Sequence, residues 1–352
     1  MNAAAFAVLS KAFDVRYAGP INPGVIGWQK ALSKFLRVAG AQGDFFFFSE
    51  RRLKAVAQEV SSRCRAEAQL DFFHGFTPWI LTKPRRPYVA WGDCTFLDYM
   101  NIFHCREQFR KGDLGRIERA EAEWMANARH IILTSDWAVH LAANQYALDA
   151  SRISSVGIFG EIEMPRHDLY AGGKEFAFVS TDFEAKGGQV ALSAFREVRK
   201  RHPDTSLVVI GDRPREALVE SGVTFVGYLR KEVLAERQRF QQILGRVRAL
   251  IHPTKSDTAP VLLVEAGYCG CPVISSRKFA IPELVDDGRS GLLLDDSSRV
   301  DVVASAMTCL LEQEDKYRQM RHAAWTKSRV EHSKDRFAKR LVSRVQEVLS
   351  GE

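Results

Sequence analysis

Two carboxylates border an apolar run in the stretch KSDTAPVLLVEAGYCGCPVISS, residues 255–276. Asp257 precedes the run, and Glu265 lies inside it with seven residues between the two. A carboxylate close to buried helix surface costs free energy unless a partner or solvent compensates its charge. Either the two groups cap and solvate a helix, or they face a ligand.

The residues around Asp257 predict the N-terminus of a helix. Ser256, Asp257 or Thr258 can serve as the N-cap, and Pro260 suits the first helical turn because its missing N–H is no loss there. The free N–H groups at such an N-terminus favour an anion. Asp257 would then stand just before the helix, and Glu265 would lie in its second turn.

The elements that position these residues alternate regularly from residue 175 onward. Short apolar runs, each separated from the next by a polar or helical segment, predict strands at 176–180, 206–211, 223–228, 248–253, 271–276 and 290–296. This alternation is typical of βαβ units and predicts a parallel sheet covered on both faces. Right-handed crossovers place the C-terminal ends of such strands on one edge, where ligands bind.

The first half of the chain alternates less regularly. The predicted helices cover 24–38, 52–68, 117–128 and 137–148, and the predicted strands cover 13–19, 70–76, 87–93, 130–136 and 153–158. The polar segment 160–175 is a candidate linker between two α/β domains. A dinucleotide-type domain opens with a strand and a glycine-rich turn, and both are missing or replaced here.

Composition and charge narrow the class of protein. A chain of 352 residues favours two domains, and a net charge of +7 spread over both halves gives no basic nucleic-acid arm. The six cysteines form no CxxC pair and no metal-ligand spacing. We therefore expect a cytoplasmic protein with reduced thiols and no transmembrane run, and a contact with the inner face of a membrane stays open.

The order of the motifs resembles the retaining glycosyltransferases of family 4, the glycosyl transferases group 1. The acidic pair is followed by AGYCGCPVISS and IPELVDDGRSGLLL, and FVSTDFEAKGGQVALSAFREVRKRH resembles the strand, loop and helix that carry the family's basic phosphate clamp. The resemblance implies an α/β protein of the GT-B class, in which two Rossmann-like domains with parallel sheets face each other across a cleft. The domains expected are an acceptor-side domain at 1–165, a nucleotide-sugar domain at 170–330, and a helix at 331–352 that packs back toward the first domain.

The resemblance also implies roles for single residues. Glu265 would accept hydrogen bonds from the ribose hydroxyls, Asp257 would stand beside the donor sugar, and Lys186 would neutralise the diphosphate. The expected donor site is completed by Thr181, Ala259, Pro260 and Val261. The chain departs from the family at Asp257, where glutamate is usual, and at Thr181, which occupies the position of the clamp's arginine.

Structural alternatives stay open for each of these residues. Asp257 can act only as a helix cap, Glu265 can lie on a solvated helix face, and Lys186 can be an exposed loop lysine. In the first half, Asp93 and His104 are candidates for contact with an acceptor.

The function implied is a metal-independent, retaining transferase of the hexosyltransferase type. It would move a sugar from a nucleotide-sugar donor to a glycan, lipid-linked or small-molecule acceptor, with no cofactor, no metal and no nucleic-acid partner. The alternative is a non-catalytic GT-B protein that binds a nucleotide or a partner. A nicotinamide oxidoreductase is disfavoured because the chain lacks a G-x-G-x-x-G turn.

Overall fold

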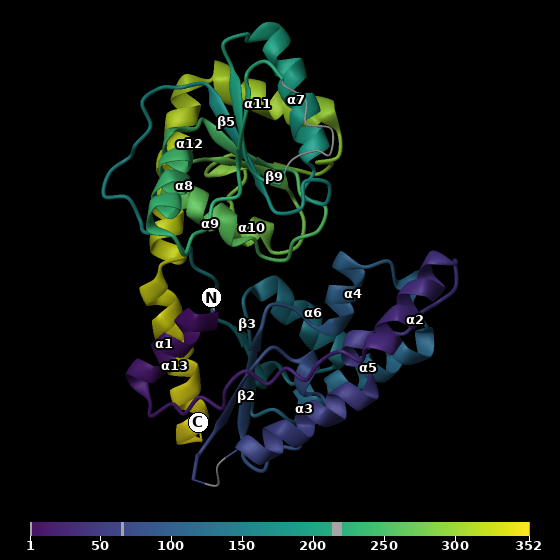
Figure 1. The fold of residues 1–352 in the computed structure, drawn as a ribbon. Coiled ribbons are helices and arrows are strands. Elements are labelled where there is room, and N and C mark those ends of the chain that lie inside the picture. Colours follow the sequence, from purple (N-terminus) through teal and green to yellow (C-terminus); the bar gives the residue numbers. More distant parts are fainter. Residues whose placement is uncertain (1, 65–66, 213–219, 352) are drawn as a thin grey trace. The chain divides into compact units, whose positions relative to one another are not determined.

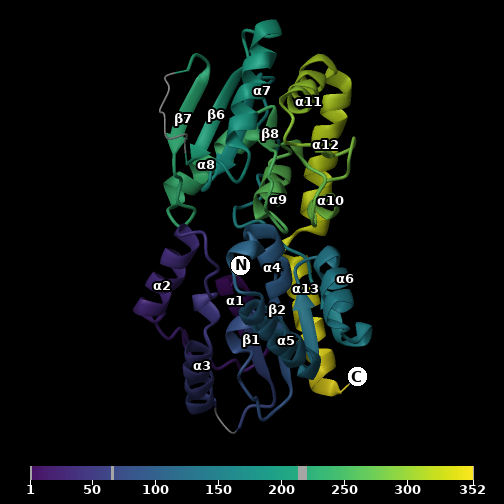
Figure 2. The same ribbon diagram turned by 90° about the vertical axis from the view of Figure 1, so that its right-hand side faces the viewer.

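A computed structural model describes residues 2–64, 67–212 and 220–351 of the chain, which divides into two units. Unit 1 comprises Met1–Gly157 together with Ala338–Glu352, and unit 2 comprises Ile158–Phe337 (Figures 1 and 2). Within the described residues, no helix is both long enough and apolar enough to cross a bilayer.

Unit 1 is built on a four-stranded parallel sheet in the order β1-β2-β3-β4. Its strands are β1 (Asp71–His74), β2 (Tyr88–Gly92), β3 (His130–Leu133) and β4 (Ile153–Ser155). Its helices are α1 (Asn2–Ala12), α2 (Gly27–Val38), α3 (Glu50–Arg63), α4 (Phe96–Phe103), α5 (Lys111–Asn127), α6 (Asp136–Tyr146) and α13 (Lys334–Ser350), with short 3₁₀ turns at Phe46–Phe48, Thr77–Trp79, Arg106–Gln108 and Ala150–Arg152. Figure 1 shows α1 and α13 on one face of the sheet and α3, α5 and α6 on the other.

Helices on both faces explain why the central strand of unit 1 is apolar throughout. All five residues of β2 are buried, and so are Leu53 and Val56 of α3 and Leu114 and Ile117 of α5, which pack in the same core. The spacing of three residues within each helical pair places both side chains on one face of the helix.

The predicted strand at 13–19 is wrong. The segment forms no strand in the structure, and the side chain of Tyr17 within it is 69% exposed. Alternating polar and apolar residues become a strand only where a neighbouring strand takes up the backbone hydrogen bonds. The described part of 13–19 forms no ladder with β1, the edge strand of the sheet.

The C-terminal helix α13 spans the boundary between the units in sequence. Its residues from Ala338 onward belong to unit 1. Phe337, Leu341 and Val345, spaced four residues apart on one face of the helix, are buried, whereas Leu349 near its end is 39% exposed.

Unit 2 contains a six-stranded parallel sheet in the order β10-β9-β8-β5-β6-β7. Its strands are β5 (Glu175–Ser180), β6 (Ser206–Gly211), β7 (Val223–Gly227), β8 (Ala249–His252), β9 (Val273–Ser276) and β10 (Gly291–Leu294). Its helices are α7 (Gly188–Arg201), α8 (Leu234–Arg246), α9 (Val261–Tyr268), α10 (Ile281–Leu284), α11 (Val300–Glu312) and α12 (Glu314–Glu331). Renumbered from its first strand, this is the doubly wound order 3-2-1-4-5-6, and it reverses between the neighbouring strands β5 and β8.

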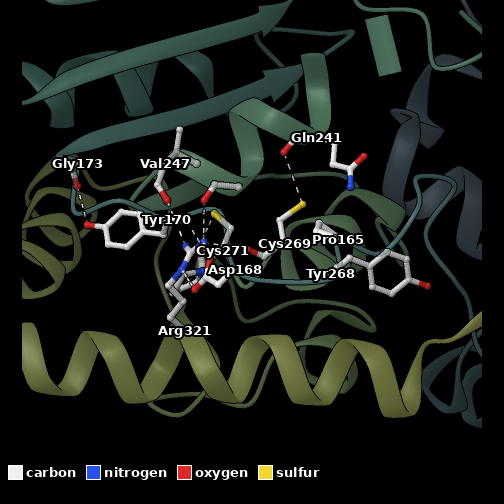
Figure 3. A network of polar contacts seen from close by, with 12 residues as sticks. Pro165, Asp168, Tyr170, Gly173, Gln241, Val247, Tyr268, Cys269, Cys271 and Arg321 are labelled. Carbon is white, nitrogen blue, oxygen red and sulfur yellow. Dashed lines mark hydrogen bonds and ion pairs between the residues drawn. The ribbon is translucent and has the colours of Figure 1, made fainter. Parts of the chain in front are cut away.

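Arg321 anchors the polar segment 160–175, which belongs to unit 2. Arg321 of α12 is 4% exposed, and its guanidinium pairs with both oxygens of Asp168. The same group donates to the carbonyls of Gly245 at 2.8 Å and Cys269 at 2.9 Å. Figure 3 shows the guanidinium at the centre of these contacts. Asp168 is thereby anchored to the ends of α8 and α9.

Candidate functional site

Lys186 and Asp257 meet where the strand order of unit 2 reverses. Lys186 lies in the loop between β5 and α7, and Asp257 lies in the loop between β8 and α9. The Lys186 ammonium donates to Oδ2 of Asp257 at 2.6 Å and to the carbonyl of Ser256 at 2.6 Å. The two charged side chains are 20% and 21% exposed. Ligands of doubly wound sheets bind at this point of the sheet, so Lys186 and Asp257 lie where they could contact such a ligand.

Gly187 allows the two loops to approach each other this closely, and Gly188 allows the β5–α7 loop to pack on its own Phe183. Gly187 has φ of +80°, and a Cβ at this position would lie 2.6 Å from the carbonyl oxygen of Pro253 at the end of β8. A Cβ on Gly188 would lie 2.5 Å from the ring of Phe183. The sequence AKGGQ therefore brings Lys186 onto the loop that carries Asp257.

Asp257 is held in its ionised form by two neighbours. His252, at the end of β8, is 2% exposed, and its Nε2 lies 3.4 Å from Oδ2 of Asp257. Burial raises the pKa of Asp257, but its pairing with His252 and Lys186 outweighs burial, and the pKa lies below its ordinary value. The carboxylate is therefore charged at neutral pH.

The predicted capping of α9 is wrong. The helix begins at Val261, Pro260 occupies the N-cap position, and no side chain accepts a cap hydrogen bond there. The carboxylate of Asp257 is directed to Lys186 instead, which excludes the cap-only alternative for this residue. The backbone N–H groups of Val261 and the following residue are the first of the helix and have no acceptor within it.

Glu265 lies in the second turn of α9 with 0% exposure. The ammonium of Lys231 contacts its two oxygens at 2.9 and 2.6 Å, and the backbone N–H of Glu161 donates to Oε1 at 3.0 Å. Burial raises the pKa of Glu265, and Lys231 offsets only part of that effect. Total burial contradicts the alternative that Glu265 lies on a solvated helix face.

No sequence pattern predicted a role for Lys231. It lies in the loop between β7 and α8, and its ammonium lies 5.1 Å from the centre of the Phe240 ring. The available signal was indirect: a glutamate in the apolar run VLLVEAGYC requires a cationic partner if it is buried and ionised. Nothing in the local sequence shows which of the chain's lysines and arginines supplies it.

The other residues predicted for the donor site lie close in sequence to the Lys186–Asp257 and Lys231–Glu265 pairs, but their side chains form no hydrogen bond or ion pair with them. Thr181 directly follows β5 and is exposed. Ala259 is half-buried and Pro260 is buried, between Asp257 and the first turn of α9. Val261, the first residue of the helix, is half-buried.

The two acceptor-side candidates lie in unit 1. Asp93 is exposed after β2, and its carboxylate accepts the N–H of Cys94 at 3.1 Å. The ring of His104 packs among aromatic rings, 4.9 Å from Tyr99 and 5.5 Å from Phe45. Burial, and then the charge of Arg37, lower the pKa of His104, which favours the neutral imidazole.

The described cysteines and acidic residues form neither a disulfide nor a metal-binding cluster. All six cysteines are free thiols. Over the described ranges, the His, Cys, Asp and Glu side chains form no group of three or more that could hold a metal ion.

The fold is that of GT-B glycosyltransferases, as the sequence predicted. A sucrose-phosphate synthase from Thermosynechococcus elongatus aligns with 86% of this chain and 80% of its own at a TM-score of 0.65 and 14% identity. The Anabaena protein HepE in complex with UDP and glucose aligns with 95% of this chain and 85% of its own, at a TM-score of 0.56 and 16% identity. These likenesses show the fold.

Sequence comparison shows which part of the chain carries the family resemblance. Residues 161–326 match the family model described as Glycosyl transferases group 1. A D-inositol 3-phosphate glycosyltransferase of Corynebacterium kroppenstedtii is 29% identical over 40% of this chain and 33% of its own length. A GDP-mannose-dependent alpha-(1-6)-phosphatidylinositol monomannoside mannosyltransferase of Mycolicibacterium smegmatis is 28% identical over 36% of this chain and 35% of its own. The matched stretch thus spans about a third of these relatives, and the predicted resemblance to this family is confirmed.

We expect Lys231→Met to destabilise unit 2 by about 3 kcal/mol, because it leaves the buried Glu265 carboxylate without its cation. Adding Glu265→Gln should recover most of the loss, since the charge is then gone. Urea unfolding of the three proteins measures both effects.

Lys174→Met is the matched control, because Lys174 forms a surface pair with Asp204 in which both side chains are well exposed. Lys174→Met should lower the free energy of unfolding by less than about 1 kcal/mol. A Lys231→Met protein as stable as this control would contradict a structural role for the Lys231–Glu265 pair.

Proposed function

We propose that this protein transfers a sugar from a nucleotide-sugar donor to an acceptor hydroxyl, and that it binds the donor at the C-terminal edge of the unit 2 sheet. The Lys186–Asp257 pair at the point of strand reversal carries this proposal. The family match of residues 161–326 and the UDP complex of the structural neighbour HepE support it.

Lys186 is suited to the diphosphate of such a donor. An ammonium has three donors, and the contacts with Ser256 and Asp257 leave one N–H for a phosphate oxygen. The first N–H groups of α9 add the favourable end of a helix dipole at the same loop. Negative charge grows on the diphosphate as the glycosidic bond breaks, so this cluster stabilises the leaving group without requiring a metal ion.

Asp257 is suited to the sugar side of the same bond. Its ionised carboxylate is fixed by Lys186 and His252, and positive charge develops at the anomeric carbon during transfer. We infer a transfer with retention of configuration, through front-face attack within an ion pair. The paired carboxylates of glycosidases offer no model here, because Glu265 is fully buried against Lys231.

Glu265 is assigned to the ribose hydroxyls of the donor. Oε1 of Glu265 already accepts hydrogen bonds from Lys231 and from the Glu161 N–H, whereas Oε2 accepts only from Lys231 and keeps one acceptor site. Because the side chain has 0% exposure, a ribose hydroxyl reaches Oε2 only if the Lys231 side chain that lies against it moves. The assignment therefore carries a structural requirement: Lys231 moves when the nucleoside binds.

For the acceptor, the proposal names only a chemical class. The matched relatives are named for inositol phosphate and phosphatidylinositol substrates, which favours a phosphorylated polyol or a lipid-linked acceptor. Unit 1 would supply the acceptor contacts, with Asp93 and His104 as candidates.

Lys186→Ala should weaken binding of a nucleoside diphosphate by about 1.5–3 kcal/mol, since it removes a charge-assisted contact to phosphate. Binding of the free nucleoside should hardly change. Calorimetric titration with UDP, GDP and ADP, and with the matching nucleosides, separates the two effects. Lys200→Ala is the control, because Lys200 is an exposed lysine paired with Glu197 on α7. Equal losses for diphosphate and nucleoside would refute the phosphate assignment.

Asp257→Asn should leave diphosphate affinity nearly intact and lower turnover by at least about tenfold, because only transition-state stabilisation is lost. Slow hydrolysis of UDP-, GDP- and ADP-sugars without acceptor provides the readout. Unchanged turnover would remove Asp257 from the chemistry. A wild-type protein that neither binds nor hydrolyses any of these sugars would favour the non-catalytic alternative.

A further inference from the structure

The helix α2 of unit 1 turns an apolar face outward. Trp28, Leu32, Phe35 and Val38 are 62%, 48%, 68% and 89% exposed. Their spacing of four, three and three residues places all four on one side of the helix. A surface helix of a globular protein normally directs such a stripe toward the core. We call these four residues the α2 stripe.

The opposite face of α2 packs on unit 1 and combines Ser33 and Arg37 with the half-buried Leu36. Ser33 is 3% exposed, and its hydroxyl donates to the carbonyl of Asp44 at 2.7 Å. A Cβ on Gly43 would lie 2.4 Å from Oγ of Ser33, so a glycine is needed at this contact. Arg37 lies over the ring of Phe109 at 5.0 Å. These contacts fix the rotation of the helix, and the α2 stripe is exposed as a consequence.

Positive charge lies beside the α2 stripe. Lys30 and Lys34 are exposed on the flank of the helix between the stripe and the packed face, and α2 contains no acidic residue. Across a shallow hollow between α2 and α3, Arg51 adds a further positive charge, while Lys54 and Glu50 pair at 2.6 Å. Figure 1 shows α2 at the outer edge of the helical layer of unit 1.

We propose that α2 docks unit 1 on an anionic lipid surface. A helix with Trp, Phe and Leu on one side and lysines at its flank lies in the plane of a bilayer interface, with the apolar side chains at the acyl boundary and the lysines at anionic headgroups. A second copy of the chain fits this face less well. A two-fold contact through the stripe would bring Lys30 and Lys34 of both copies together, and lysine is depleted from protein–protein interfaces.

Co-sedimentation of the full chain with vesicles tests the proposal. Binding is expected to vesicles of phosphatidylcholine with phosphatidylglycerol, and to be weak with phosphatidylcholine alone or at high salt. The Leu32→Glu and Phe35→Glu double variant should bind at least about tenfold more weakly, because two inserting side chains become charged. Lys30→Ala and Lys34→Ala should each cost about fivefold.

Val330→Glu on α12 is the matched control, because Val330 is 59% exposed in unit 2, and its vesicle binding should equal that of the wild type. The replaced stripe residues are exposed, so circular dichroism and thermal unfolding of the double variant should be unchanged. Absent vesicle binding, or binding that the α2 variants do not alter, overturns the proposal. Loss of an oligomer in light scattering, without loss of vesicle binding, would identify the stripe as a contact between copies and overturn it as well.

Discussion

The buried charge of Glu265 determines how the C-terminal edge of the unit 2 sheet is built. An ionised carboxylate with 0% exposure costs several kcal/mol unless a cation lies against it. The loop after β7 must therefore bring Lys231 over α9, and the backbone at Glu161 must add a further donor. The start of unit 2 and the β7–α8 loop are thus joined at one side chain.

Asp257 repeats the same arrangement one loop away. Its charge is compensated by Lys186 from the β5 loop, and the glycine at 187 lets that loop approach Pro253, the residue that follows β8. Each carboxylate is thereby matched with a lysine from a different loop, and both lysines lie at the edge where a doubly wound sheet binds ligands. A diphosphate at this edge would compete for Lys186, whose position is already fixed before the phosphate arrives.

The sequence predicted the parts of this site that depend on local pattern. Alternating apolar runs located the strands of unit 2, and the apolar residues around Glu265 in VLLVEAGYC agree with its burial. Three features escaped prediction because they depend on tertiary contacts. The local sequence of Lys231 is that of an ordinary loop lysine, and only the tertiary fold places it beside Glu265. The helix start at Val261 reflects an aspartate already engaged elsewhere, and 13–19 lacks a strand to pair with.

A crystal structure of the protein with a bound nucleoside diphosphate tests the central claim most directly. We expect the β-phosphate within hydrogen-bonding distance of the Lys186 ammonium and the first N–H groups of α9, and the ribose hydroxyls at Glu265 with Lys231 displaced. A nucleotide bound elsewhere, or one whose phosphates leave the Lys186–Asp257 pair untouched, would contradict the account.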